Sequence, residues 1–261
     1  MSQTHMLAKI RKLLAKAEDP AASPEESETY TAKAAQLIAD YGIDAALLSA
    51  DDPGSDRVAD RVVGLDAPYA RDKAQLLCDI ANRLRCQAVL RTRPVAQGPT
   101  EHSVHLFGHE SDLTRTDLLF TSLLMQSTHR LAQTPVPPWE HKAAFRRSWQ
   151  AGFRMSVSRR LAEAESRAQT QATGRTSHDG RSTGLVLADR SSEVAHALRD
   201  AYPTAGRARA RSLSGSGMRE GYLAGEVADL GGTRLRGGRI PIASTEAAPP
   251  GTAGPPRGAT R

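Results

Sequence analysis

Residues 145–161 read FRRSWQAGFRMSVSRRL and carry a large apolar side chain at every fourth position. This spacing keeps the apolar side chains on one face of an α-helix, so the stretch predicts an amphipathic helix. The chain of 261 residues has only 2 Trp, 5 Tyr and 4 Phe, and three of these rings lie on this stripe. We therefore expect a helix from about residue 140 to 168 to form the central core. The stripe consists of Phe145, Trp149, Phe153, Val157 and Leu161.

The segment upstream of this helix predicts further helices and a small sheet. Three prolines between residues 135 and 138 end a preceding helical pattern. Alternating apolar residues on either side of a Pro- and Gly-containing loop at 93–101 predict a β-hairpin. The predicted helices are 72–85, a helix from Ser111 or Asp112 to about 132, and 140–168; the predicted strands are 61–65, 86–91 and 102–107.

Downstream of the core helix, the pattern is less regular. The apolar run at 185–187 predicts a short strand, followed by a helix at 192–201. Gly217, Gly221 and Gly225 then recur every fourth residue in a helical pattern. Because an internal glycine costs about 1 kcal/mol of helix propensity, this spacing predicts close backbone packing against a neighbouring helix. A glycine-rich loop is the alternative.

The N-terminal residues predict a pair of helices. Met6, Ile10 and Leu13 recur at helical spacing until about Pro20. The sequence Ser-Pro-Glu-Glu at 23–26 combines a capping serine with a proline at the first helical position, so a second helix is expected to begin there. We expect Gly42 to end that helix and residues 43–48 to add a short helical turn.

The string KIRKLLAKAEDPAASPEESETYTAKAAQLIADYGID at 9–44 resembles the N-terminal module of the domain of unknown function 2786 family, which occurs in bacteria and their phages. Residues 108–124 and 145–153 are similar to the companion domain that usually follows it. The resemblance implies an architecture and supplies no activity or catalytic residue. The expected fold class is α+β. Its expected parts are a helical hairpin module at 5–48, a linker at 49–60, a helix-rich α+β domain at 61–240 and a disordered Pro- and Gly-rich tail at 241–261.

Composition excludes several classes of protein. No run approaches the roughly 20 apolar residues that cross a bilayer, so we expect no membrane partner. The first residues lack the apolar core of a signal peptide, and a cytoplasmic location is expected. Cys78 and Cys86 form no CxxC pair, which argues against a zinc ribbon or a disulfide framework.

Basic residues point to a polyanion. The chain has 35 Lys and Arg against 29 Asp and Glu, a net charge of +6. We expect a noncatalytic protein that binds DNA or RNA through backbone phosphates; solvated helix faces, or a protein partner docked on the N-terminal hairpin, are the alternatives. The candidate residues are Lys9, Arg11, Lys12 and Lys16; Arg146, Arg147, Arg154, Arg159 and Arg160; and Arg207, Arg209 and Arg211.

A second hypothesis is a metal-dependent hydrolase or nuclease with a divalent ion held by His105, His109, Glu110 and Asp112. Both histidines converge only if the chain turns back at Gly108. The alternative is an exposed strand and a helix capped by Ser111 or Asp112, with His109 solvated. The chain has no HExxH, Walker or GxSxG motif, so no cofactor other than such a metal is expected.

Overall fold

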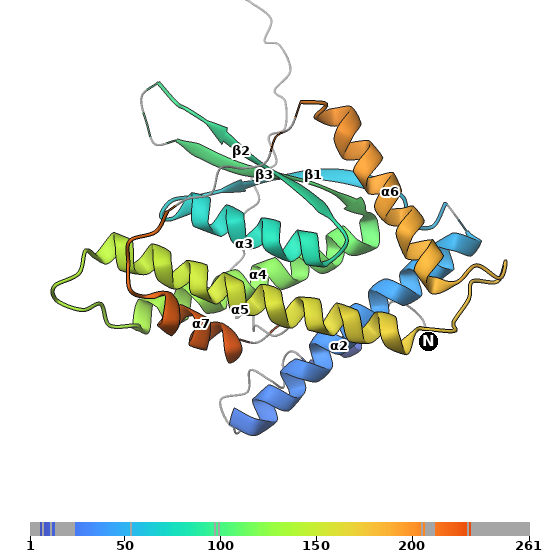
Figure 1. Ribbon diagram of the computed structural model, residues 1–261, viewed down its shortest axis with the longest axis horizontal. Coiled ribbons are helices and arrows are strands. Elements are labelled where there is room, and N and C mark those ends of the chain that lie inside the picture. Colours follow the sequence, from blue (N-terminus) through green and yellow to red (C-terminus); the bar gives the residue numbers. More distant parts are fainter. Residues whose placement is uncertain are drawn as a thin grey trace, which may run out of the picture.

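The computed structural model describes residues 24–52, 54–96, 98, 100–204, 206, 212–228 and 230, together with 6, 8–10, 12 and 13; for 24–32, 34 and 35 it describes the backbone. The helices are α2 (Pro24–Asp51), α3 (Ala70–Arg83), α4 (Glu110–Gln133), α5 (Lys142–Gln171), α6 (Thr183–Ala201) and α7 (Met218–Glu226). The helices α3 and α4 cover one face of a small sheet, and a further helix, α6, contacts all three strands (Figure 1). This arrangement confirms the α+β fold class.

The sheet has three antiparallel strands in the order β1-β3-β2. They are β1 (Val58–Leu65), β2 (Gln87–Arg93) and β3 (Glu101–His109). The pairing of β2 with β3 confirms the predicted hairpin. β1 begins three residues earlier than predicted, because Val58 pairs with His109 at the far end of β3.

The predicted apolar stripe of α5 is buried. Its five side chains are at most 2% exposed, and the rings of Trp149 and Phe153 stack with their centroids 5.5 Å apart. Val104 and Leu106 of β3 are fully buried in the same hydrophobic cluster as Leu77 of α3. The core therefore lies between the sheet and the helices α3, α4 and α5, as the spacing predicted.

The glycines of α7 lie against the backbone of α5, which confirms the predicted close packing. A Cβ atom at Gly221 would overlap the carbonyl oxygen of Trp149, and one at Gly225 would lie 2.7 Å from that of Phe153. Gly152 on α5 completes the contact from the other side, because its Cβ would overlap the carbonyl oxygen of Met218.

Gly42 does not end a helix, so that prediction is wrong. The helix α2 runs through it to Asp51 and includes the residues predicted as a separate turn. The glycine is needed for space: a Cβ atom there would overlap the guanidinium groups of Arg85 and Arg115. A tertiary contact, rather than a helix stop, accounts for the residue.

The strand predicted at 185–187 is also wrong, since these residues lie in the first turns of α6. Ser182 caps this helix by accepting a hydrogen bond from the Leu185 amide at 3.3 Å. Val186 and Leu187 are buried against Ala46 of α2 and neighbouring side chains. A run of three apolar residues does not distinguish a strand from one face of a helix.

The segment predicted as a linker at 49–60 overlaps two regular elements, because α2 ends at Asp51 and β1 begins at Val58. The described residues of the first predicted helix are helical, and Met6 and Ile10 join the main hydrophobic cluster. The rest of that helix and the predicted tail at 241–261 lie outside the described residues.

Candidate functional site

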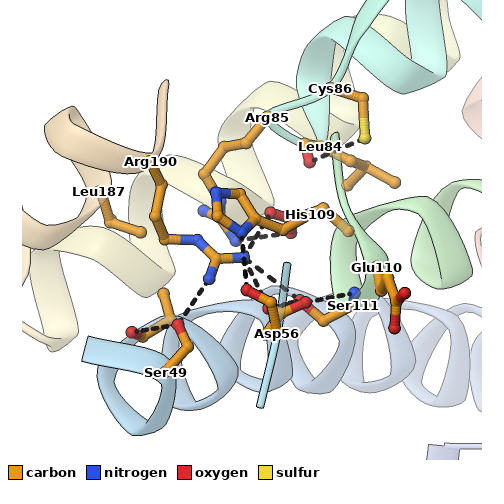
Figure 2. A network of polar contacts seen from close by, with 12 residues as sticks. Ser49, Asp56, Leu84, Arg85, Cys86, His109, Glu110, Ser111, Leu187 and Arg190 are labelled. Atoms are coloured by element: carbon orange, nitrogen blue, oxygen red, sulfur yellow. Dashed lines mark hydrogen bonds and ion pairs between the residues drawn. The ribbon is translucent and has the colours of Figure 1, made fainter. Parts of the chain in front are cut away.

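A network of buried charges lies where α2, α4, α5 and α6 meet the end of β3; Figure 2 shows the part of it around Arg190 and His109. Burying an ion costs several kcal/mol unless partners compensate it. Three arginines and three carboxylates compensate one another here, from segments far apart in the sequence. The network consists of Asp56, Arg85, Asp112, Arg115, Glu165 and Arg190.

Asp112 lies at the centre of this network and is 1% exposed. Its carboxylate accepts a hydrogen bond from Arg115 Nη1 at 2.7 Å and lies 3.3 Å from Arg190 Nη2 and 3.5 Å from Arg85 Nη2. Arg115 and Arg85 also bind Glu165, the latter through Nη1 at 2.7 Å. Each of these two arginines thereby bridges a carboxylate on α4 to one on α5.

Electrostatics keep Asp112 ionised. Burial alone would raise the pKa of this carboxyl, but the positive charges of Arg85, Arg115 and Arg190 together outweigh it. The pKa of Asp112 therefore lies below its ordinary value of 3.8. A carboxylate in this state holds the three guanidinium groups in place at neutral pH.

Arg85 reaches the network from an unusual backbone position. It follows α3 with φ of +64°, in the left-handed region where glycine is usual after a helix. A non-glycine residue in that region costs of order 1 kcal/mol. This position places its guanidinium group beside Asp112 and Glu165.

Asp56 caps α4 from a distant segment. Its carboxylate accepts hydrogen bonds from the Ser111 amide at 3.0 Å and the Ser111 hydroxyl at 2.6 Å, and pairs with Arg190 at 2.8 Å (Figure 2). The expected cap by Ser111 or Asp112 is therefore wrong: His109 is the N-cap residue, and its side chain makes no cap hydrogen bond.

His109 is buried rather than solvated, with 4% of its surface exposed. Its Nδ1 lies 3.1 Å from the backbone carbonyl oxygen of Asp56, which assigns the proton to Nδ1. Its Nε2 lies 3.3 Å from Glu193 Oε2. Both side chains line a cavity of about 370 Å³ beside Arg190, and the hydrogen bond of His109 to Asp56 ties the end of β3 to the segment between α2 and β1.

The four candidate metal ligands do not come together. β3 continues through Gly108, so His105 and His109 are four residues apart along one extended strand, about 13 Å. His105 instead binds Tyr202 Oη and Asp60 Oδ2, each at 2.8 Å. Glu110 is exposed and Asp112 belongs to the charge network. Within the part of the chain that the structure describes, no three His, Cys, Asp or Glu side chains gather to hold a metal ion.

Neither cysteine is suited to nucleophilic chemistry. Burial is the main cause that raises the pKa of both Cys78 and Cys86 to about 12. A thiol with such a pKa is protonated at neutral pH, whereas a cysteine nucleophile reacts as the thiolate.

The basic candidates have different surroundings. Lys9 and Lys12 are exposed, and Arg146 and Arg147 are half-buried in the first turns of α5. Arg154 pairs with Asp79 at 2.9 Å. Five candidates lie outside the described residues: Arg11, Lys16, Arg207, Arg209 and Arg211.

A basic groove of about 820 Å³ lies along α3 and α5, which run side by side in Figure 1. Arg83 of α3 donates to Ser158 Oγ at 2.8 Å across it. Arg159 binds Glu163 and Glu226, the latter at 2.7 Å. The charged residues that line this groove are Arg83, Arg154, Arg159 and Arg167, with Asp79 and Glu163.

The sequence did not identify Arg83 or Arg167 as part of a site. Arg83 is the last residue of α3, and Arg167 lies in the final turns of α5. Both read as ordinary surface charges on amphipathic helices. Only the pairing of α3 with α5 brings them to one surface, and no local pattern encodes that pairing.

Residues 5–45 match the family model described as "Protein of unknown function (DUF2786)", as the resemblance predicted. No curated protein and no solved structure matches the chain. Among the described helices, none combines the length and apolar character needed to cross a membrane.

Proposed function

We propose that this is a noncatalytic, nucleic-acid-associated binding protein of the bacterial or phage cytoplasm, and that the basic groove between α3 and α5 contacts backbone phosphates. The observation that supports the proposal is the composition of the groove. Four arginines and two carboxylates line it, and a third carboxylate, Glu226, binds Arg159 from beside it. Arginine is well suited to phosphate because its planar guanidinium donates two parallel hydrogen bonds.

The arginines of the groove differ in how freely they reach a ligand. Arg154 and Arg159 are held by carboxylates. Arg167 is exposed and has no ion-pair partner among the described residues, and Arg83 is exposed with a single hydrogen bond to a neutral hydroxyl. Arg83 and Arg167 are therefore the side chains expected to bind phosphate, with Arg154 and Arg159 shaping the surface between them.

The test is the salt dependence of binding to fluorescently labelled DNA and RNA, measured by anisotropy from about 50 to 200 mM salt. We expect affinity to fall linearly on a log–log plot. The double variant Arg83→Ala/Arg167→Ala should weaken binding and reduce the slope by about 1 for each lost phosphate contact.

Arg91→Ala/Arg199→Ala is the matched control, since it also removes two charges, from exposed residues of β2 and α6 that do not line the groove. Its binding should remain close to that of the unmodified chain. Absence of binding at low salt would refute the proposal, and an equal effect of the groove and control variants would refute the groove as the binding surface.

A further inference from the structure

Trp139 is the most exposed large apolar side chain among the described residues, at 87%. The other tryptophan, Trp149, is fully buried in the core. A tryptophan ring left in water forgoes a large gain from burial. Its position in the short connection between α4 and α5, the loop at the left end of Figure 1, therefore calls for a binding role.

The loop that carries Trp139 is anchored on both sides of the ring. Val136 packs against the main hydrophobic cluster, and the Glu140 amide donates to the Pro137 carbonyl at 3.0 Å. The Glu140 carboxylate accepts hydrogen bonds from the Ser216 amide and hydroxyl, at 2.6 and 2.5 Å. These contacts fix the loop in a conformation that leaves the Trp139 ring exposed to solvent.

The charges that follow Trp139 in the chain are one carboxylate, Glu140, which accepts hydrogen bonds from Ser216, and then three cations in the first two turns of α5. Lys142 begins α5, Arg146 and Arg147 follow within two turns, and the first turn of α5 has no acidic residue. Cations here add to the positive end of the helix dipole instead of neutralising it. None of the other exposed large apolar side chains belongs to the described part of this loop or to the first two turns of α5.

The helix α5 extends from the loop that carries Trp139 to the basic groove. Arg147 and Arg154 are seven residues apart, so they share a face of α5 about 10 Å apart along its axis. Arg154 lines the groove. Arg147 therefore lies between the start of α5 and the groove proposed for phosphates, on the side of the helix that carries Arg154.

We propose that Trp139 stacks on an unpaired base of a single-stranded nucleic acid whose backbone follows the basic face of α5. The inference rests on the proposed function and specifies its ligand as single-stranded. Bases of a duplex are stacked on one another and do not offer a free face, whereas those of a single strand do.

The experiment uses intrinsic fluorescence together with affinity. Because Trp149 is fully buried, quenching of emission by an unlabelled oligonucleotide reports on Trp139. Trp139→Ala should weaken binding of a single-stranded oligonucleotide by about 5- to 150-fold and leave the salt slope unchanged. Trp139→Phe, which keeps an aromatic face, should recover most of the affinity, and duplex of the same length should be little affected by either change.

Three outcomes would overturn the inference. The first is binding of the single strand without quenching of the tryptophan emission, which would assign the ring to a different class of partner. The others are a Trp139→Ala variant that binds single strand and duplex more weakly to the same extent, or one that loses no affinity at all. If the Arg83→Ala/Arg167→Ala variant still weakens binding in those cases, the proposed function stands without the stacking role. If no nucleic acid binds at low salt, both fail.

Discussion

At Gly42 a missing side chain makes room for the charge network. The guanidinium groups of Arg85 and Arg115 occupy the space that a Cβ atom would take. Both groups are fixed by ion pairs with Asp112 and Glu165. Neither arginine can move without weakening those pairs.

Gly42→Ala should therefore lower the free energy of unfolding by about 1–3 kcal/mol, although alanine is the better helix former. Urea denaturation followed by circular dichroism measures the change. Gly184→Ala is the matched control, because Gly184 lies in α6 with no atom near its Cβ position. Because Gly184 is the second residue of α6, where helix propensity counts less than in the interior, this substitution should leave stability unchanged or raise it slightly. Equal effects of the two substitutions would contradict the packing argument.

Asp112 makes the free energy of unfolding depend on pH. Its pKa is lower in the folded protein than in the unfolded chain, so the unfolded chain takes up the proton at higher pH. Its contribution is complete above the ordinary value of 3.8, decreases as the pH falls below it, and is lost once the pH passes the folded pKa.

Asp112→Asn should accordingly lower the unfolding free energy at pH 7 by about 3–5 kcal/mol, because three arginines lose a central charge. This difference in unfolding free energy between the variant and the unmodified chain should become smaller as the pH approaches the pKa of Asp112 in the folded protein. Unfolding measured at a series of pH values tests this, and a deficit that did not change down to pH values well below 3.8 would contradict it.

At the scale of a helix or strand, α7 depends on backbone contact with α5. Arg159 pairs with Glu226 at 2.7 Å, and Arg160 donates to the carbonyl oxygens of Gly225 and Ala228. These polar contacts flank the surface where Gly221 and Gly225 lie against the backbone of α5. The nine-residue helix is too short to be stable alone, so its order depends on this docking.

Gly221→Ala should detach α7, because the new Cβ would meet the backbone of Trp149, which cannot rotate away. Hydrogen exchange at residues 218–226 should become faster by an order of magnitude or more, while the core of α5 keeps its protection. Leu223→Ala, on the exposed side of the same helix, should leave exchange nearly unchanged. Uniform acceleration across the whole chain would argue for global destabilisation instead.

Elements with a repeated pattern, such as α5, α7 and the hairpin of β2 and β3, could be predicted from the sequence, whereas an isolated short apolar run could not. The stripe of α5 covers residues 145–161, which is longer than a typical strand, and the glycine repeat of α7 stands in an otherwise helical pattern. The run at 185–187 is three residues long and fits either structure, and its contacts with α2 decide in favour of a helix. The early start of β1 also depends on a partner, since β3 supplies its hydrogen bonds.

At the scale of the whole molecule, α2 connects two hydrophobic clusters. Its Ile38 and Tyr41 belong to the main core, while Ala39 and Ile43 pack with side chains of α6 and the end of α5. Because one helix contributes to both clusters, loosening of either cluster affects the other.

We therefore expect the described helices to unfold in one step. In a Trp139→Phe background, emission from buried Trp149 reports the core, and far-ultraviolet circular dichroism reports all helices. The two urea transitions should coincide. An earlier loss of helical signal would show that the N-terminal helices form an independent module.

The charge network could not be predicted from the sequence. Asp56 lies in a polar, acidic stretch, and Arg190 and Arg115 read as outward charges on helices. Their burial follows from the meeting of segments between residues 56 and 190, and no local pattern marks which charges will be enclosed. Of the four proposed metal ligands, Asp112 proved important, but as the centre of an ionic cluster.

The strand order β1-β3-β2 has a consequence for biosynthesis. The central strand is the last of the three to be translated, so β1 and β2 leave the ribosome before the strand that both pair with. Until residues 101–109 have followed, neither strand has a partner within the sheet, and both offer unpaired backbone groups to other chains. Chaperone protection during that interval would matter more for this protein than for one whose sheet grows strand by strand.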